Sequence, residues 1–325
     1  MDNKILVGGC YEKLQELEEN TVQTCVTSPP YWNLRDYEQE KQLGLEDTPE
    51  EYTQHLVKIF HQLKRVLRPN GTLWLNLGDT YFGAKGGHYS SDNSATNDTT
   101  GSKYRMHLKA PKKHAFLKTK DLVGIPWMVA RALQQDGWYL RNDIIWAKPN
   151  CMPEAVKDRC VKSHEHVFLF AHPESKGRYY FDHEAIQEEI NTKYIGRYFS
   201  KNNVKERKDY GREEYTLGSE NQDKFYKKWQ EKIEKGEIPK KNKRDVWTIT
   251  TSSYGGKHFA VFPTRLILPC IMAGSKEGDT VIDVFAGSGT TCKVAQSLGR
   301  KWVAIELNPE YAKLIEEQTA QQNLF

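Results

Sequence analysis

The chain has 325 residues, of which 38% are hydrophobic and 11% aromatic, and its formal net charge is +4. This length suits one large domain or two smaller ones, and the aromatic content argues against a disordered chain. No stretch approaches the roughly 20 consecutive apolar residues of a membrane span, and the N-terminus lacks the pattern of a signal peptide. The 6 cysteines include no CxxC pair, which argues against a disulfide framework or a thiolate metal site. We therefore expect a cytoplasmic protein with no membrane partner and no metal.

Positive charge is concentrated in two segments. Residues 101–120 hold seven Lys or Arg and no acid, and residues 191–245 hold 16 Lys or Arg against 10 Asp or Glu. The rest of the chain has 24 basic against 33 acidic residues. Basic segments on an acidic chain are typical of a nucleic-acid partner, although lysine-rich loops are also often merely solvated. Aromatic residues within both segments favour the nucleic-acid interpretation.

Strands and helices alternate along most of the chain. In chain order, the apolar patterns predict strand 4–10, helix 11–19, strand 22–27, helix 49–67, strand 72–77, helix 121–135, strands 138–147, 166–170 and 178–182, helix 263–273, strand 280–284, helix 290–298, strand 302–306 and helix 309–319. The clearest helix start is Thr48-Pro49 with Glu51, which match an N-cap, a first helical position and a capping box. This alternation predicts an α/β fold with a parallel sheet covered by helices.

Two segments interrupt the alternation. Residues 82–120 are polar with little periodicity, and a connection of this length is usually functional or mobile. Residues 186–245 are polar and charged, with one candidate helix near 220–235. We expect the second segment to be an inserted small module rather than part of the core.

A glycine-rich loop follows the predicted strand 280–284 and opens the next helix. Gly287 and Gly289 allow the backbone to approach a ligand, and the exposed amides at Thr290 favour an anionic group. Glu306 ends the next strand, where a doubly wound fold places an acid against ribose hydroxyls. These features predict a nucleoside cofactor, with an ordinary tight turn as the alternative.

The loop departs from the dinucleotide-binding pattern in two places. Cys292 stands at the third glycine position, and the acidic Asp283 precedes the loop. An acid there would repel a pyrophosphate, whereas it suits the cationic aminoacyl end of S-adenosylmethionine.

A second motif, Ser28-Pro29-Pro30-Tyr31, directly follows a predicted strand. The two prolines lack amide protons and fix φ, which leaves a rigid ledge with free carbonyls. Such a ledge can hold a planar exocyclic amine, because Ser28 and the Pro29 carbonyl can accept its hydrogens while Tyr31 stacks on the ring. Taken alone, PPY is as often a turn, but this alternative is hard to hold beside a cofactor loop.

The chain resembles the amino-group (exocyclic) DNA methyltransferases of bacterial restriction-modification systems. Within these it is similar to the permuted β group, in which the catalytic motif precedes the cofactor motif. The similar segments are TSPPYW at 27–32, LNLGDTY at 75–81, DIIWAKPN at 143–150, MPEAVKDR at 152–159, SHEHVFLF at 163–170, RDVWTI at 244–249, HFAVFPTRLI at 258–267 and DVFAGSGTT at 283–291. Ser before PPY goes mostly with cytosine N4 as the target. Gly8-Gly9-Cys10 stands where many relatives read GDC, so no adenine contact is assigned there.

The resemblance implies a Rossmann-like, circularly permuted methyltransferase fold that depends on S-adenosylmethionine. It implies a catalytic half at 1–185, with a mobile loop at about 82–120, a target-recognition region at 186–245 and a cofactor-binding half at 246–325. The expected reaction is methylation of the N4 amino group of cytosine in double-stranded DNA, with the base flipped out onto Tyr31. The expected catalytic residues are Ser28, Pro29, Pro30 and Tyr31, and the expected cofactor-binding residues are Asp283, Phe285, Gly287, Gly289, Thr290, Glu306, Phe262, Pro263 and Asp79.

Three other functions are compatible with parts of the pattern. Methylation of adenine N6 uses the same motif chemistry. A nicotinamide-dependent oxidoreductase would need a third loop glycine and has no use for the SPPY motif, and a non-catalytic nucleic-acid binder is disfavoured because neither motif is broken. His164 and His166 resemble a metal pair without a third ligand, so we expect a structural role there, and we expect Trp32 in the core. A homodimer and a separately acting restriction endonuclease are further candidate partners.

Overall fold

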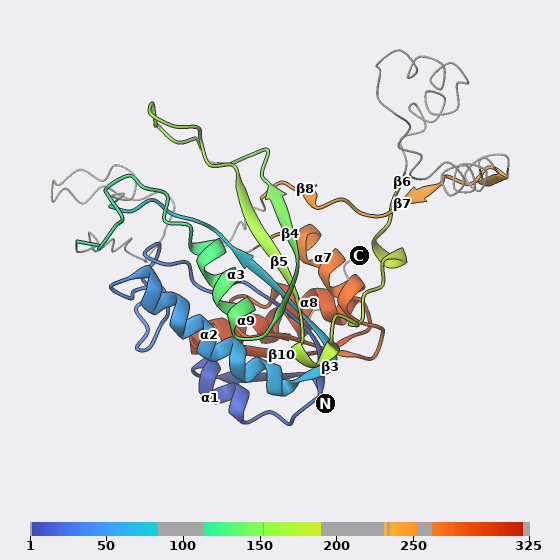
Figure 1. The fold of residues 1–325 in the computed structure, drawn as a ribbon. Coiled ribbons are helices and arrows are strands. Elements are labelled where there is room, and N and C mark those ends of the chain that lie inside the picture. Colours follow the sequence, from blue (N-terminus) through green and yellow to red (C-terminus); the bar gives the residue numbers. More distant parts are fainter. Residues whose placement is uncertain are drawn as a thin grey trace, which may run out of the picture. The chain divides into compact units, whose positions relative to one another are not determined.

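The computed structural model describes residues 2–83, 113–151, 153–189, 231–232, 235–251 and 262–320 (Figure 1). The chain divides into two compact units, one formed by Met1–Asp182 with Asp245–Phe325 and the other by His183–Arg244. Most of the predicted loop at 82–120, most of the basic segment at 191–245 and the candidate helix at 220–235 lie outside the described residues.

An eight-stranded sheet forms the centre of the first unit. Its strands are β1 (Lys4–Val7), β2 (Val22–Thr27), β3 (Leu67–Leu77), β4 (Tyr139–Ala147), β5 (His164–Ala171), β8 (Val246–Thr248), β9 (Thr280–Asp283) and β10 (Lys301–Glu306). Their order is β1-β10-β9-β2-β3-β5-β4-β8. Strand β5 is antiparallel to β3 and β4, and all other neighbours are parallel. The predicted α/β fold is confirmed, but the sheet is mixed rather than wholly parallel.

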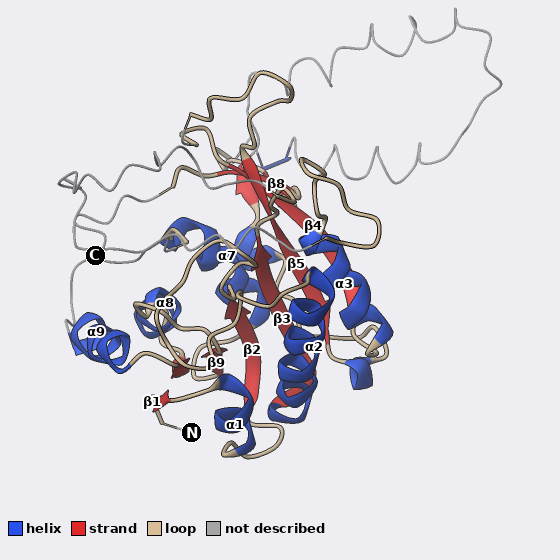
Figure 2. Cartoon of the chain, turned by 90° about the vertical axis from the view of Figure 1, so that its left-hand side faces the viewer, coloured by secondary structure: helices blue, strands red, loops and turns tan. Residues whose placement is uncertain are grey.

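Helices cover both faces of this sheet. They are α1 (Cys10–Gln15), α2 (Pro49–Val66), α3 (Ile125–Gln135), α7 (Thr264–Gly274), α8 (Thr290–Ser297) and α9 (Pro309–Ala320). Figure 2 shows α2 and α3 on one side of the strands and α7, α8 and α9 on the other. Every residue of β2 is buried, as expected for a central parallel strand that is covered on both faces.

The start of α2 and the core agree with the sequence pattern. Thr48 Oγ1 accepts a hydrogen bond from the Glu51 amide at 3.2 Å, which is the predicted N-cap. Trp32 is 2% exposed and belongs to the core, as expected. Its indole nitrogen donates to the Glu46 carbonyl at 3.0 Å, so the buried polar group has a partner.

One predicted strand is absent, and several predicted boundaries are shifted. No strand forms at 178–182, where the backbone is irregular. Isolated backbone hydrogen bonds hold it, such as the one from the Tyr180 amide to the Asn70 carbonyl at 2.9 Å. The helix predicted from 49 to 67 ends at Val66, and β3 begins at the next residue instead of at 72. The helix predicted from 121 begins at Ile125, because its first amide groups donate to Asp79, a residue that follows β3, rather than to a local cap.

The described part of the second unit is small. It contains the short 3-10 helix η2 (Glu184–Ile186) and the antiparallel strand pair of β6 (Glu188–Glu189) and β7 (Lys240–Lys241). Glu188 accepts from Lys243 Nζ at 3.2 Å. Among the described residues of the whole chain, no helix is both long and apolar enough to cross a bilayer, and no group of three His, Cys, Asp or Glu side chains is placed to hold a metal ion.

Candidate active site

The carboxyl ends of β2, β9 and β10 bring the two sequence motifs to one edge of the sheet. Strand β2 leads into Ser28, and β9 and β10 end at Asp283 and Glu306. Strands β2 and β9 are neighbours, with Thr24 opposite Val281. The chain continues from β2 to α2 on one face and from β9 to α8 on the other (Figure 2). An open α/β sheet binds its ligands at such a switch point.

A cavity of about 320 Å³ lies at this edge, which is within the range of small-molecule sites. The predicted residues in its lining are Ser28, Pro29, Pro30, Tyr31, Phe262, Phe285, Gly287, Thr290 and Glu306. Both motifs therefore face a single cavity. The other predicted residues, Asp79, Pro263, Asp283 and Gly289, do not belong to the described lining.

Asp283 lies behind the glycine loop and is 1% exposed. Its Oδ1 accepts from Thr27 Oγ1 at 2.6 Å and from the Phe285 amide at 3.0 Å, and its Oδ2 accepts from Thr291 Oγ1 at 2.6 Å. Burial raises the pKa of Asp283 to about 6, although these hydrogen bonds act to lower it. In this arrangement Asp283 connects the end of β2 to the start of α8.

Glu306 faces the cavity directly. Its carboxylate accepts from the amides of Gly287 at 2.8 Å and Asn308 at 2.9 Å, and burial raises its pKa to about 7. Gly287 has a φ of +52°, and a Cβ there would meet no atom within 4 Å. The next residue, Ser288, also lines the cavity, and its buried hydroxyl has no hydrogen-bond partner in the described structure. The loop thus offers open space, an acid and a free hydroxyl to a ligand.

A hydrogen bond from α2 holds the SPPY segment in place. Tyr52 of α2 donates its hydroxyl to the Pro30 carbonyl at 2.8 Å. Within the described residues, no hydrogen bond is formed to the carbonyl of Pro29, which lines the cavity. Two residues of the cavity wall, Ser28 and Pro29, thus carry a hydroxyl oxygen and a carbonyl oxygen that can accept hydrogen bonds.

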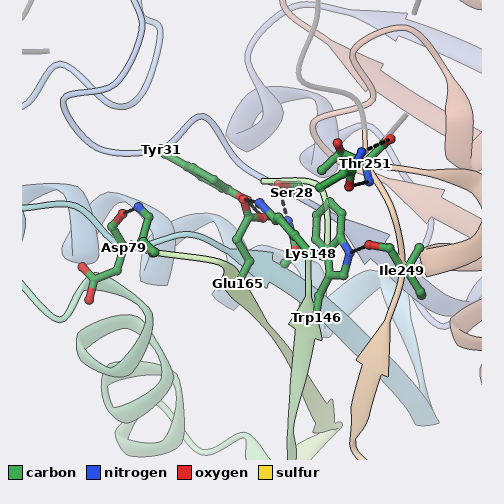
Figure 3. A network of polar contacts seen from close by, with 11 residues as sticks. Ser28, Tyr31, Asp79, Trp146, Lys148, Glu165, Ile249 and Thr251 are labelled. Carbon is green, nitrogen blue, oxygen red and sulfur yellow. Dashed lines mark hydrogen bonds and ion pairs between the residues drawn. The ribbon is translucent and has the colours of Figure 1, made fainter. Parts of the chain in front are cut away.

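The sequence interpretation missed the polar network beneath Tyr31 (Figure 3). The Tyr31 hydroxyl donates to Glu165 Oε2 at 2.6 Å, and Asn76 Nδ2 donates to the Tyr31 oxygen at 2.7 Å and to Ser28 Oγ at 3.3 Å. Lys148 forms an ion pair with Glu165. Glu165, Asn76 and Lys148 all stand in segments that carry the family resemblance, which was the available signal, but the motif spacing gave them no role.

Three predicted residues, Asp79, Pro263 and Gly289, serve the scaffold. Asp79 accepts from the amides of Gly124 at 3.0 Å and Ile125 at 3.1 Å, so its carboxylate holds the start of α3. Figure 3 shows Asp79 apart from Tyr31 and Glu165. Pro263 is the residue before α7. Gly289, with a φ of +88°, packs so closely on α9 that a Cβ would lie 3.0 Å from Ile315.

The sheet order, with one antiparallel strand near its end and a glycine loop at its centre, is that of a methyltransferase fold. The solved structure of the PvuII DNA methyltransferase (cytosine-N4-specific) superposes with a TM-score of 0.62 at 18% identity, covering 100% of this chain and 89% of that one. The complex of M1.HpyAVI with SAM superposes with a TM-score of 0.52 at 16% identity, covering 97% and 98%.

The sequence comparisons define the family. A family model described as DNA methylase matches residues 22–317. The chain is 42% identical to the type II methyltransferase M.SmaI of Serratia marcescens, over 97% of this chain and 90% of that protein. It is 41% identical to M.Cfr9I of Citrobacter freundii, over 94% and 84%. The chain belongs to the DNA methylase family, which confirms the family expected from the sequence.

Proposed function

We propose that this protein methylates the N4 amino group of cytosine at a specific site in double-stranded DNA, using S-adenosylmethionine. The observation that carries the proposal is the shared cavity, whose wall contains Ser28 and Pro29 of the SPPY segment together with Gly287 of the glycine loop. Two relatives over 40% identical are type II methyltransferases, and the PvuII enzyme with a similar fold is named as cytosine-N4-specific.

The cofactor half of the cavity fits S-adenosylmethionine. Glu306 is placed to accept the ribose hydroxyls, and Phe262 and Phe285 provide aromatic walls for the adenine. The free Ser288 hydroxyl and the open space at Gly287 suit the methionine end, whose positive charge is also favoured by the buried acid Asp283. Bound there, S-adenosylmethionine would supply the methyl group of its sulfonium, and the electron pair of the carbon–sulfur bond would stay on sulfur.

The target half of the cavity activates a weak nucleophile. The lone pair of the cytosine amino nitrogen is delocalised into the ring. Hydrogen bonds to Ser28 Oγ and the Pro29 carbonyl draw the amino hydrogens out of the ring plane and so localise the lone pair on nitrogen. Most of the acceleration then comes from positioning. A base inside a duplex cannot reach this cavity, so the cytosine is flipped out against Tyr31.

Several parts of this function stay predictions. They are the recognition of DNA sequence by residues 186–245, the closure of the loop at 82–120 on DNA, a homodimer, a separately acting restriction endonuclease and a cytoplasmic location.

The test is to incubate the protein with S-adenosylmethionine and methylation-free genomic DNA, and to analyse the digested nucleosides by mass spectrometry. We expect N4-methylcytosine with the wild type and a strongly reduced amount with Ser28→Ala. N6-methyladenine would keep the chemistry and overturn the target base. Binding of S-adenosylmethionine without any methylated nucleoside would overturn DNA as the substrate.

A further inference from the structure

Next to the SPPY segment lies a partly buried carboxylate that the proposed methyl transfer does not yet use. Glu165 comes from β5, and its side chain is 13% exposed. It accepts from the Tyr31 hydroxyl at 2.6 Å, from Asn76 Nδ2 at 3.0 Å and from Lys148 Nζ. Lys148, which follows β4, is itself only 16% exposed at its side chain. Partial burial of an ion pair costs desolvation free energy, so an ion pair in a cavity wall is a candidate for a functional role.

The reaction creates a need for a proton acceptor at this place. When the cytosine amino nitrogen forms its new bond to carbon, it becomes positively charged and holds one proton too many. The proton must leave before the product can regain a neutral ring. Neither Ser28 nor the Pro29 carbonyl can keep a proton at neutral pH, and the chain has no acid or base adjacent to the SPPY motif in sequence.

The hydrogen bonds beneath the ledge have a consistent direction. The Tyr31 oxygen accepts from Asn76 Nδ2 at 2.7 Å and donates its own hydrogen to Glu165. Asn76 Nδ2 also donates to Ser28 Oγ at 3.3 Å, so the Ser28 and Tyr31 oxygens share one donor and the Ser28 hydrogen is free to turn to the second lone pair of the Tyr31 oxygen. The Tyr31 hydrogen in turn is directed at Glu165.

We propose that Glu165, paired with Lys148, is the terminal acceptor for the proton of the target amino group, reached through the Ser28 and Tyr31 hydroxyls. This inference rests on the proposed function. The amino proton passes to Ser28 Oγ as the Ser28 hydrogen passes to the Tyr31 oxygen and the Tyr31 hydrogen passes to Glu165 Oε2. Both hydroxyls end neutral, Glu165 ends protonated, the methylated nitrogen ends neutral, and Glu165 later returns its proton to solvent.

The chemistry of Tyr31 supports transfer rather than storage of the proton. Burial, followed by the charge of Glu165, raises the pKa of Tyr31 well above its ordinary value. A phenol with a raised pKa does not persist as a phenolate, so it gives up a hydrogen only while it receives another. Before the proton leaves, the Glu165 charge also stabilises the positive charge that develops on the nitrogen, and this effect acts on the rate of methyl transfer itself.

The test compares single-turnover rates at saturating S-adenosylmethionine and cognate DNA. Tyr31→Phe keeps the ring and the Lys148–Glu165 pair but breaks the chain of hydroxyls, and Glu165→Gln keeps a side chain of similar shape without the base. Each should lower the rate by about 10²-fold, the lower end for general base catalysis, and the double variant should lose no more than either single one. Asp143→Asn is the matched control, because Asp143 on β4 pairs with His166 outside the cavity lining.

A solvent isotope effect separates a proton acceptor from a purely structural role. The charged groups that face Glu165 are Lys148, which follows β4, and Lys162 from the segment before β5. The wild-type single-turnover rate should slow in heavy water, because hydrogens move between the Ser28, Tyr31 and Glu165 oxygens, and Tyr31→Phe should lose this effect. A Tyr31→Phe rate close to that of the wild type, or an unchanged isotope effect in folded Glu165→Gln, would overturn the relay.

Folding is checked by thermal melting and by S-adenosylmethionine binding. If Glu165→Gln fails to fold because Lys148 is left buried and unpaired, Tyr31→Phe decides alone. A wild-type protein that forms no N4-methylcytosine would overturn the proposed function itself, whereas a fully active Tyr31→Phe would overturn only the relay.

Discussion

Gly78→Ala should inactivate the protein by displacing Tyr31. A Cβ at Gly78 would lie 2.5 Å from Tyr31 Cε2 and 3.0 Å from its Cδ2, whereas ordinary contacts begin at 3.4 Å. The ring must therefore move by about 1 Å, and a misplacement of this size can reduce the rate about 10²-fold. The hydroxyl end cannot follow freely, because Glu165 holds it at 2.6 Å. Gly78 does not have a positive φ, so alanine adds no backbone strain.

The assay for this variant is the single-turnover methylation rate beside S-adenosylmethionine affinity. The affinity should stay unchanged, because Gly78 does not line the cavity at the glycine loop. Gly177→Ala is the matched control. Gly177 has a φ of +80° and no neighbour within 4 Å of a Cβ, so alanine there costs about 1–3 kcal/mol of strain without touching Tyr31. A Gly78→Ala protein as active as this control would show that the ring position is not needed.

Two further predictions concern the buried acids. Burial raises the pKa of Glu306 to about 7 and that of Asp283 to about 6. Calorimetry should therefore show that the affinity for S-adenosylmethionine falls as the pH falls through these values. Glu306→Gln should remove the pH dependence of this affinity around pH 7. In the unliganded chain, the same acids should lower the free energy of unfolding as the pH rises from their ordinary values to these raised ones, since the folded state binds more protons; a slope of opposite sign would contradict the burial argument. Thr27→Val should lower the free energy of unfolding in urea by about 1.5–3 kcal/mol, because it removes a 2.6 Å hydrogen bond to Asp283, and an unchanged midpoint would refute that contribution.

The site residues that stand directly at the ends of predicted strands could be predicted from the sequence. Ser28 and Glu306 each follow a predicted strand, and the carboxyl ends of neighbouring parallel strands meet at one edge of a sheet, which agrees with their place in the lining of one cavity. The roles of Asp283 and Asp79 could not be read in this way. Whether an acid at a strand end faces a ligand or accepts from backbone amides depends on the neighbouring loop, and both take amide hydrogen bonds.

The position of Glu165 shows why the polar network around Tyr31 could not be predicted from the sequence. Its place beneath Tyr31 depends on the antiparallel insertion of β5 between β3 and β4, with His166 opposite Leu77. A shift of one residue would turn Glu165 to the other face and bring a histidine in its place. Apolar periodicity predicts a strand here, but it does not predict the register of that strand.

The pairing of β1 with β10 has a consequence for how the protein is made. Among the described strands, Lys4–Val7 pairs only with Lys301–Glu306, and β2 pairs with β9. Contacts so distant in sequence form slowly and late. The cavity therefore cannot form until β9 and β10 have been synthesised, and the apolar central strand β2 is exposed to chaperones until then.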